Sequence, residues 1–397
     1  MNYKELLVND LITDNTQEKD KVFLKTSQNS KYAASIKNYI TPFEILNQIK
    51  TPKFIGITGT NGKTTTAFVL GFLLKSLGFN VAIQGTEGFF YNLEKVEKKT
   101  LTTPPILDTL KRVAKYESDF FIMEVSSHAI VQNRIESIEF SAKILTSFSQ
   151  DHLDFHKSMD EYKKTKESFF QDESLKVVKG KKKGFFIEVD GYLFKMNEKN
   201  LYLIEKPLIE EISMAGEFNK FNFSLALKCA ELLTGRDLEE LKKILKGFKG
   251  VGGRMEVLSK NPLIVVDFAH TPDGMEKVLS SLEGKKIVVF GAGGNRDNKK
   301  RPLMGEIASK YADYIILTED NPRCENGYEI CKDIAKGVKK TYEIILNRKE
   351  AIKKAIELAG NDDIVLVLGK GDETYIEYCN KRVQYSDKET IKSLLKL

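Results

Sequence analysis

The sequence predicts an α/β protein built in three parts: a small N-terminal module, a central parallel sheet like that of phosphate-loop ATPases, and a C-terminal sheet of dinucleotide-fold type. β-branched runs alternate with helix-period patterns through most of the chain, which favours parallel sheets covered by helices. At 397 residues the chain also exceeds the length that one hydrophobic core usually supports. We therefore expect more than one domain.

The composition excludes several classes of protein. With 41% hydrophobic and 30% charged residues, the chain is typical of soluble globular proteins. Because no signal-peptide pattern and no long apolar run is present, we expect a cytoplasmic protein without membrane insertion. The net charge of +6 is spread along the chain and does not favour a nucleic-acid partner. The cysteines show no metal or disulfide spacing, so we expect four reduced thiols: Cys229, Cys324, Cys331 and Cys379.

Residues 1–48 are short of apolar sequence and predict only a reduced N-terminal module. A strand is expected at Val22–Leu24 and a helix at Pro42–Ile49.

Residues 49–253 predict the central domain, because strand and helix patterns alternate there. The expected strands are Val81–Ile83, Phe120–Val125 and Ile144–Phe148, and the expected helices are Ile106–Tyr116, Met159–Phe170, Asn222–Leu233 and Leu238–Leu245. Three apolar runs between 184 and 204 predict a β meander, whose last strand is Leu201–Leu203. The lysine-rich run at 179–183 just before it predicts a solvated turn.

A second alternation over residues 254–397 predicts the C-terminal domain. Its expected strands are Leu263–Val266, Lys286–Phe290, Tyr314–Leu317 and Ile364–Leu368. The glycines of Gly250–Gly253 can absorb backbone rotation, so this segment is a candidate hinge.

The most informative stretch is the segment 54–66, in which a β-branched run enters a loop of small residues and a helix-period pattern leaves it. Such a strand, loop and helix cradle phosphate groups with backbone N–H groups. Lys63 supplies a positive charge for the outer phosphates, and the Thr64 hydroxyl can bind Mg²⁺. Ile57 stands where the first glycine of the usual pattern would be, and Gly59 takes over that place. We expect a nucleotide site here.

Glu124 comes at the carboxyl end of an apolar strand, the edge where open α/β sheets bind ligands. It is a candidate for a metal position, although a strand-end acid capping a helix is the alternative. His128, His152 and His156 lie close in sequence, and the pattern D-H-x-D-x-H around the last two suggests a ligand or metal role. Ordinary structural histidines remain the alternative.

Lys166 falls on the apolar stripe of the helix expected at Met159–Phe170, because each residue turns a helix by about 100°. Tyr162, Phe169 and Phe170 lie on the same stripe. A lysine on a buried face must find a partner or change its charge state. One chemical route is carbamylation by CO₂, which turns the amine into an anionic metal ligand, whereas a lysine that snorkels to solvent is the plain alternative.

Three polar segments follow strands of the C-terminal domain. Asp267 can hold a ribose hydroxyl, and a G-x-G-G run comes before Arg296. In Asp320-Asn321-Pro322-Arg323, the Asn and Arg can hold a carboxylate while the Asp holds an ammonium. A plain Asn-Pro turn is the alternative.

Nine motifs, taken in order, resemble those of the Mur ligases, the ATP-dependent amino-acid-adding enzymes of peptidoglycan synthesis. They are T-G-T-N-G-K-T-T (58–65), T-T-P (102–104), M-E-V-S-S-H (123–128), D-H-L-D (151–154), G-R-M-E (253–256), D-F-A-H-T-P (267–272), K-R-P-L-M-G (300–305), D-N-P-R (320–323) and G-K-G (369–371). The resemblance implies the three-domain Mur ligase architecture. The D-N-P-R form is similar to that of the branch of the family that adds meso-2,6-diaminopimelate.

The resemblance also implies a role for each matching residue. ATP would be held by Gly59, Thr60, Asn61, Gly62, Lys63, Thr64, Thr65 and Asp267. One Mg²⁺ would be held by Thr64 and Glu124, and a second by His152 and a carbamylated Lys166. A UDP-muramoyl dipeptide would contact Thr102, Thr103, Ser126, Gln132 and Arg134. Diaminopimelate would contact Arg296, Asp320, Asn321, Pro322, Arg323, Gly369 and Glu373. Among these, Lys63, Glu124, His152 and Lys166 are the expected catalytic group.

The chain departs from the family pattern at several positions. Ser147 and Gln150 replace the usual Asn and Arg before D-H-L-D, and Asp372 replaces the usual His after G-K-G. Asp14-Asn15-Thr16 stands where the family has D-S-R, so the uridine contacts are not assigned.

We therefore expect a ligase that uses ATP and Mg²⁺ to form an acyl phosphate, acts on small-molecule substrates and works as a monomer. The alternatives are a lysine-adding muramyl ligase, a folylpolyglutamate synthase, a phosphate-loop switch or nucleic-acid-dependent ATPase, and a non-enzymatic nucleotide-binding module.

Overall fold

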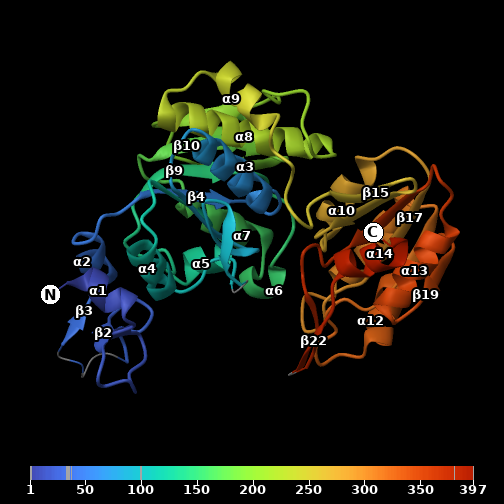
Figure 1. Ribbon diagram of the computed structural model, residues 1–397, viewed down its shortest axis with the longest axis horizontal. Coiled ribbons are helices and arrows are strands. Elements are labelled where there is room, and N and C mark those ends of the chain that lie inside the picture. Colours follow the sequence, from blue (N-terminus) through green and yellow to red (C-terminus); the bar gives the residue numbers. More distant parts are fainter. Residues whose placement is uncertain (1, 33–35, 37, 99–100, 380, 397) are drawn as a thin grey trace. The chain divides into compact units, whose positions relative to one another are not determined.

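The computed structural model describes residues 2–32, 36, 38–98, 101–379 and 381–396 (Figure 1). The chain divides into two compact units, which we describe one at a time. The first comprises Met1–Phe148, Phe155–Glu211 and Lys220–Phe248, and the second comprises Ser149–Asp154, Ile212–Asn219 and Lys249–Leu397. Both are α/β, which confirms the predicted fold class, while the domain boundaries at 48 and 253 stay a prediction. Among the described residues, no helix combines the length and the apolar character needed to cross a bilayer.

The first unit begins with a small parallel sheet of three strands in the order β1-β2-β3. The strands are β1 (Ile12–Thr13), β2 (Val22–Leu24) and β3 (Tyr39–Ile40), flanked by the helices α1 (Tyr3–Val8) and α2 (Pro42–Leu46). The predicted strand at β2 is confirmed, and the predicted helix ends at Leu46 instead of Ile49. Thr41 and Glu44 form a capping box that fixes the start of α2.

The main sheet of this unit has eight strands in the order β14-β10-β9-β4-β8-β5-β6-β7. The six strands from β14 to β5 are parallel, and β6 and β7 add an antiparallel hairpin. Their bounds are β4 (Lys53–Thr58), β5 (Val81–Gly85), β6 (Gly88–Tyr91), β7 (Glu94–Glu97), β8 (Phe120–Glu124), β9 (Phe140–Leu145), β10 (Leu175–Lys179) and β14 (Leu201–Ile204).

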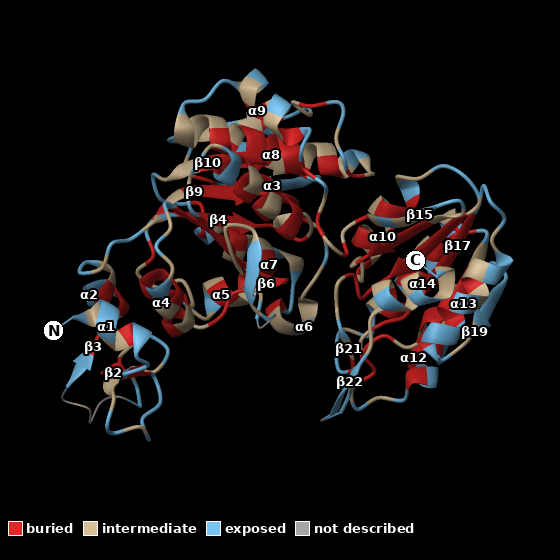
Figure 2. Ribbon diagram, in the orientation of Figure 1, coloured by how far each residue is buried: buried red, intermediate tan, exposed pale blue. Residues whose placement is uncertain are grey.

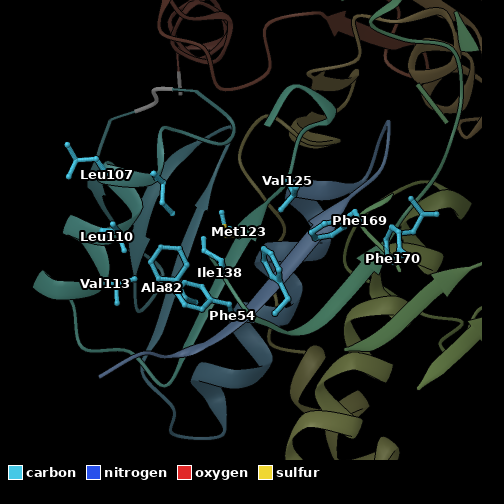
Figure 3. Packing of buried hydrophobic residues seen from close by; sticks show 14 of the residues in the cluster. Phe54, Ala82, Leu107, Leu110, Val113, Met123, Val125, Ile138, Phe169 and Phe170 are labelled. Carbon is cyan, nitrogen blue, oxygen red and sulfur yellow. The ribbon is translucent and has the colours of Figure 1, made fainter. Parts of the chain in front are cut away.

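Helices cover this sheet, and Figure 2 shows its central strands as buried. The buried apolar residues of the strands and helices form its core. The helices are α3 (Lys63–Ser76), α4 (Ile106–Lys115), α5 (Ser127–Val131), α6 (Leu153–His156), α7 (Met159–Ser168), α8 (Glu217–Thr234) and α9 (Leu238–Leu245). Figure 3 shows Leu110 and Val113 of α4 in the same cluster as Ala82 of β5 and Met123 of β8. The spacing of three residues between Leu110 and Val113 puts both on one face of α4.

Three further predictions for this unit are wrong in part. β9 spans Phe140–Leu145 instead of Ile144–Phe148, because Thr146 and Ser147 hydrogen-bond to the loop after β4. The meander is built from β11 (Lys181–Lys183), β12 (Phe186–Val189) and β13 (Tyr192–Phe194). The segment at 201 instead joins the main sheet as β14, and the lysine run forms the exposed strand β11 instead of a turn.

The second unit is organised by a six-stranded sheet in the order β15-β16-β20-β17-β18-β19, in which β15 is the antiparallel edge strand. The strands are β15 (Glu256–Lys260), β16 (Leu263–Asp267), β17 (Lys286–Phe290), β18 (Tyr314–Leu317), β19 (Tyr342–Ile344) and β20 (Ile364–Leu368). One core cluster joins the sheet to α10 (Pro272–Ser280), α11 (Lys300–Tyr311) and α12 (Gly327–Ala335). A second joins its alternate residues to α13 (Arg348–Leu358) and α14 (Asp387–Leu395). The hairpin of β21 (Tyr375–Tyr378) and β22 (Lys381–Gln384) completes the unit.

The prediction of four reduced thiols is wrong for one pair. Cys324 and Cys379 form a disulfide, although they are 55 residues apart in sequence. The backbone N–H of Arg323 donates to the carbonyl of Glu377, so the two segments run side by side. The spacing of the cysteines in the sequence could not predict this contact between distant segments. Cys229 and Cys331 are buried free thiols, as expected, and burial raises the pKa of each to about 12.

A buried ion pair ties α13 to α14 in the second unit. The guanidinium of Arg348 donates to both carboxylate oxygens of Asp387 at 2.8 Å, and both side chains are fully buried. Burial opposes the charge on Arg348, but the carboxylate outweighs it and raises the pKa of the arginine. Arg348 also donates to the carbonyl of Leu368 at 2.9 Å, at the end of β20.

We predict that Asp387→Ala lowers the free energy of unfolding of this unit by about 3–5 kcal/mol, because it leaves a buried guanidinium without its carboxylate. Urea denaturation followed by circular dichroism measures the change. Glu389→Ala on the same helix is the control, because its exposed pair with Lys392 is worth less than about 1 kcal/mol. Equal losses in the two variants would contradict the prediction.

Candidate functional site

The loop between β4 and α3 has the backbone of a phosphate cradle. Gly59 has φ of 148° and Gly62 has φ of 89°, so both adopt conformations that favour glycine. A Cβ atom on Gly59 would lie 2.0 Å from Thr146 Oγ1, and one on Gly62 would lie 2.3 Å from Asn222 Oδ1. No larger side chain fits at either place.

The segment after β9 holds this loop. The backbone N–H of Thr60 donates to the carbonyl of Ser147 at 3.0 Å, and that of Asn61 donates to Ser147 Oγ at 2.9 Å. Ser147 Oγ also donates to the carbonyl of Asn61 at 3.0 Å. The serine that replaces the usual asparagine here therefore fixes the loop with its short hydroxyl.

Lys63 is the first residue of α3, where a helix N-terminus favours an anion. Its ammonium donates to the carbonyls of Gly59 at 2.8 Å and Thr60 at 3.0 Å, so the charge lies over the loop. Thr64 and Thr65 follow in the first turn, and both are buried. The predicted phosphate-binding residues are thus brought together in one loop and one helical turn.

Glu124 ends β8 as a buried carboxylate, 1% exposed, surrounded by donors. Thr64 Oγ1 donates to its Oε1 at 2.9 Å. Thr86, which follows β5, donates its backbone N–H to Oε1 and its hydroxyl to Oε2, both at 3.0 Å. Gly85 makes room for the carboxylate, because a Cβ atom there would lie 2.2 Å from Oε1.

This set of donors fits a magnesium ion. A carboxylate and a hydroxyl are hard oxygen ligands, and Mg²⁺ completes its shell with phosphate oxygens and water. Among the described residues, no three His, Cys, Asp or Glu side chains gather as a metal site. A site with one carboxylate and one hydroxyl is consistent with that finding, because a nucleotide would supply the other ligands.

The five residues expected to contact the sugar peptide form one network beside Glu124. Thr103 Oγ1 donates to the backbone carbonyl of Glu124 at 2.8 Å and accepts the N–H of Ser126 at 3.0 Å. Arg134 donates to the carbonyl of Thr103 at 2.8 Å and to the side chain of Gln132. The hydroxyl of Thr102 lies 3.2 Å from that of Thr86.

Lys166 is buried on α7, 1% exposed, as its place on the apolar stripe predicts. Its ammonium donates to Thr58 Oγ1 at 3.1 Å and lies 4.9 Å from the centre of the Tyr162 ring. Thr58 is the last residue of β4, immediately before the phosphate loop. The buried lysine therefore reaches the start of that loop, and its carbamylation stays a prediction.

In the second unit, His152 has φ of 56°, and its Nε2 lies 3.3 Å from Asp151 Oδ2. Burial opposes the charge on Asp151, but His152, His270 and Lys300 together lower its pKa. A cavity of about 180 Å³ opens beside this aspartate, lined in part by Gln150, Asp151, Thr271, Asp273, Asp297 and Lys300. His152 and Lys166, the predicted ligands of a second metal, belong to different units. A metal site shared by the two stays a prediction.

Asp267 ends β16 as a buried carboxylate, and burial raises its pKa. Its two oxygens accept the backbone N–H groups of Met255 and Ala269, each at 2.7 Å. The side chain of Asp267 therefore links the backbone at Met255 to the backbone that follows β16. Its predicted contact with a ribose hydroxyl stays a prediction.

The predicted diamino-acid residues meet at one edge of the six-stranded sheet. Asn321 Nδ2 donates to Glu373 Oε2 at 2.9 Å, and Lys370 Nζ lies 3.1 Å from the same oxygen. A Cβ atom on Gly369 would lie 2.4 Å from Asp320 Oδ2. Gly293 lies against both arginines, with its Cβ position 3.0 Å from Arg323 Nη1 and 3.6 Å from Arg296 Cγ. Cations and carboxylates therefore alternate around Asn321, which is what a zwitterion requires.

Residues 57–183 match the description "Mur ligase middle domain", and residues 253–371 match "Mur ligase, glutamate ligase domain". A Helicobacter pylori protein, named UDP-N-acetylmuramoyl-L-alanyl-D-glutamate--2,6-diaminopimelate ligase, is 40% identical and is covered over 94% of its length by 96% of this chain. A protein of the same name from Wolinella succinogenes is 38% identical, with 97% of this chain and 96% of its own length covered. This chain belongs to the Mur ligase family.

Solved structures agree with that assignment. A structure of a UDP-N-acetylmuramoyl-L-alanyl-D-glutamate--2,6-diaminopimelate ligase has a TM-score of 0.59 and 25% identity, with 97% of this Mur ligase and 94% of that chain covered. A Mycobacterium tuberculosis folylpolyglutamate synthase has a TM-score of 0.68 but 14% identity, over 87% of this chain and 93% of its own. The second likeness shows the shared fold alone.

Sequence reasoning missed three residues of this Mur ligase site. Thr86 follows β5, the strand beside β8, so its nearness to Glu124 follows from the strand order but not from a motif. Lys370 lies inside the recognised G-K-G segment, and its fully buried ammonium is a further partner of Glu373. Glu377 pairs with Arg323 from β21, and no sequence signal marked it.

We predict that Gly85→Ala weakens binding of a metal–nucleotide complex by about tenfold in this Mur ligase, because the added methyl displaces the carboxylate of Glu124. Calorimetry with a non-hydrolysable ATP analogue and Mn²⁺ measures it.

Gly247→Ala in the same unit is the matched control, because its Cβ atom would meet nothing nearer than 3.4 Å. Full metal-dependent affinity in a folded Gly85→Ala protein would show that Glu124 does not hold the ion.

Proposed function

We propose that this Mur ligase joins meso-2,6-diaminopimelate to the γ-carboxylate of the D-glutamyl residue of UDP-N-acetylmuramoyl-L-alanyl-D-glutamate, with ATP as the energy source. The product belongs to peptidoglycan synthesis. Relatives that carry this activity in their names align with nearly the whole chain at 38–40% identity. We further propose that the enzyme works in the cytoplasm as a monomer on small-molecule substrates.

The observation that carries the choice of amino acid is the set of charges around Asn321. The distal end of meso-diaminopimelate carries one carboxylate and one ammonium. Arg323 offers a guanidinium for the carboxylate, and Asp320 and Glu373 offer carboxylates for the ammonium. Lysine has the ammonium but lacks the carboxylate, so it would bring no substrate carboxylate to Arg323.

ATP is proposed to lie on the loop at 59–65. There the helix N-terminus, the glycines and Lys63 present N–H groups and positive charge to the phosphates. Relatives by fold bind such nucleotides, since a Mycobacterium tuberculosis folylpolyglutamate synthase is complexed with ADP. Mg²⁺ held through Thr64 and Glu124, and a second ion through His152 and carbamylated Lys166, would neutralise phosphate charge.

An amide bond does not form from a carboxylate and an ammonium in water without a leaving group. The γ-carboxylate is proposed to attack the γ-phosphorus of ATP, which releases ADP and leaves an acyl phosphate. The deprotonated amine of diaminopimelate then adds to the acyl carbon, and inorganic phosphate leaves. No protein nucleophile is needed, so positioning and charge neutralisation by Lys63 and the loop N–H groups are the main contribution of the chain.

A lysine-adding muramyl ligase and a folylpolyglutamate synthase are the alternatives within this fold. The second is favoured by structural likeness alone, at 14% identity. Neither lysine nor glutamate carries both a carboxylate and a second amino group at its far end, as diaminopimelate does.

We predict that phosphate release from ATP requires both the UDP-muramoyl dipeptide and meso-diaminopimelate. The test incubates the enzyme with ATP and the dipeptide plus meso-diaminopimelate, lysine or glutamate, and measures phosphate and ligated product. Efficient ligation of lysine or glutamate would overturn the proposed substrate. Hydrolysis of ATP that does not depend on any amino acid would overturn the reaction class.

We predict that Lys166→Ala lowers turnover by at least about a hundredfold, because the buried anionic ligand formed from this lysine is lost. Short carboxylates such as formate or acetate should restore part of the activity by occupying the space. The control is Lys164→Ala, because Lys164 lies on the same helix with its side chain 70% exposed. Wild-type turnover in the Lys166→Ala enzyme would rule out the carbamate.

A further inference from the structure

The side chain of Arg323 is held at two points within the second unit. Its Nε lies 2.9 Å from Glu377 Oε2, and its Nη1 donates to the carbonyl of Gly294 at 2.8 Å. A guanidinium has five N–H donors in a fixed fork. Nε and Nη1 point to opposite edges of that fork, so these two contacts fix the plane of the guanidinium. Within the described part of the chain, this leaves the N–H groups of Nη2 to meet a carboxylate.

Glu377 is itself held in place by hydrogen bonds of its backbone to the segment 321–323, which contains Arg323. Its backbone N–H donates to Asn321 Oδ1 at 2.9 Å, and its carbonyl accepts the N–H of Arg323 at 2.8 Å. Two residues further on, the disulfide between Cys379 and Cys324 joins the hairpin to the residue after the arginine. The backbone of β21 thus runs along the segment 321–324, and the side chain of Glu377 is aimed at the guanidinium.

Glu377 also pairs with a second arginine. Glu377 Oε1 lies 3.5 Å from Nη2 of Arg382, which comes from β22 and stacks on the ring of Tyr375 at 4.5 Å. The three side chains Arg323, Arg382 and Glu377 taken by themselves carry a net charge of +1, so the second arginine adds to the attraction for a substrate carboxylate. Arg382 is 63% exposed, and β22 is exposed along its length (Figure 2).

We propose that Glu377 is a positioning residue for amino-acid selection: it orients the guanidinium of Arg323 so that the pocket takes an amino acid with a distal carboxylate and refuses one without it. This inference rests on the proposed function. Glu377 does not touch the substrate. It fixes the fork of the arginine before the substrate arrives, which reduces the loss of side-chain freedom on binding.

The test is Glu377→Gln, which keeps the shape of the side chain and removes its charge. The KM for meso-diaminopimelate should rise by about tenfold, because the acceptor of Arg323 Nε loses its negative charge and holds the guanidinium less firmly. The KM for ATP and the kcat/KM for lysine should change by less than about twofold, because neither depends on Arg323. Glu329→Gln on α12, which makes the same chemical change at a pair with Lys332, is the matched control.

A double-mutant cycle separates positioning from a general effect on folding. In an Arg323→Ala background, which should itself raise the KM for diaminopimelate, Glu377→Gln should add less than about twofold if it acts through that arginine. An equal further loss would overturn the inference. Thermal unfolding of each variant, measured alongside, checks that the hairpin is retained.

Arg382→Gln keeps the inference testable if the glutamate variant does not fold. Its exposed side chain can be changed without disturbing a core, and it should raise the KM for diaminopimelate by about two- to fivefold while lysine is unaffected. Unchanged kinetics in Glu377→Gln or, if that variant does not fold, in Arg382→Gln would overturn the inference alone, provided that the wild-type enzyme ligates diaminopimelate. A wild-type enzyme that does not use diaminopimelate would overturn the proposed function, and the inference with it.

Discussion

The site of the first unit depends on one buried carboxylate, that of Glu124. A charge held in a protein interior must be met by donors, and here they come from Thr64 on α3 and from Thr86 after β5. The arrangement couples the end of one strand to the end of its neighbour and to the first turn of the helix that follows the phosphate loop. The same strand end, through its backbone carbonyl, holds Thr103 and with it the network of Ser126 and Arg134. Nucleotide binding and sugar-peptide binding are therefore proposed to share a single rigid anchor.

Most of the fold and a large part of this site follow from the sequence, for physical reasons that apply to particular residues. Buried parallel strands read as continuous apolar runs, so Lys286–Phe290 and Ile364–Leu368 were predicted with the bounds that the structure gives them. Lys166 was placed on a buried stripe by helical period alone, and it is 1% exposed. The failures share one cause, because they depend on contacts between distant segments. The segment Leu201–Ile204 leaves the meander because it pairs with β10 in the main sheet, and the disulfide of Cys324 exists because β21 lies along the loop. Glu377 was missed for the same reason.

The two units build their binding edges in a similar way. In the first, Glu124 lies against Gly85 at the end of β5. In the second, Asp320 follows β18 and lies against Gly369 at the end of β20. Each glycine comes at the carboxyl end of a strand and leaves the space that the acid occupies. Such edges are where open α/β sheets bind ligands, and a side chain at either glycine would fill the place of the carboxylate. Packing against Asp320 thus gives a reason for the first glycine of the G-K-G segment, beside its proposed contact with a substrate.

The difference between the edges lies in what surrounds the acid. Glu124 is met by two neutral hydroxyls and a backbone N–H, so its negative charge is kept for a cation, as a metal ligand requires. Around Asn321 the acids are interleaved with the ammonium of Lys370 and the guanidinium of Arg323, so that edge offers both signs of charge at once. A guanidinium that was not held in place would pair with any nearby anion, including the acids of its own pocket. Glu377 at Nε and the carbonyl of Gly294 at Nη1 hold the guanidinium in one plane. We propose that this turns a general attraction for anions into selection of one carboxylate at one position.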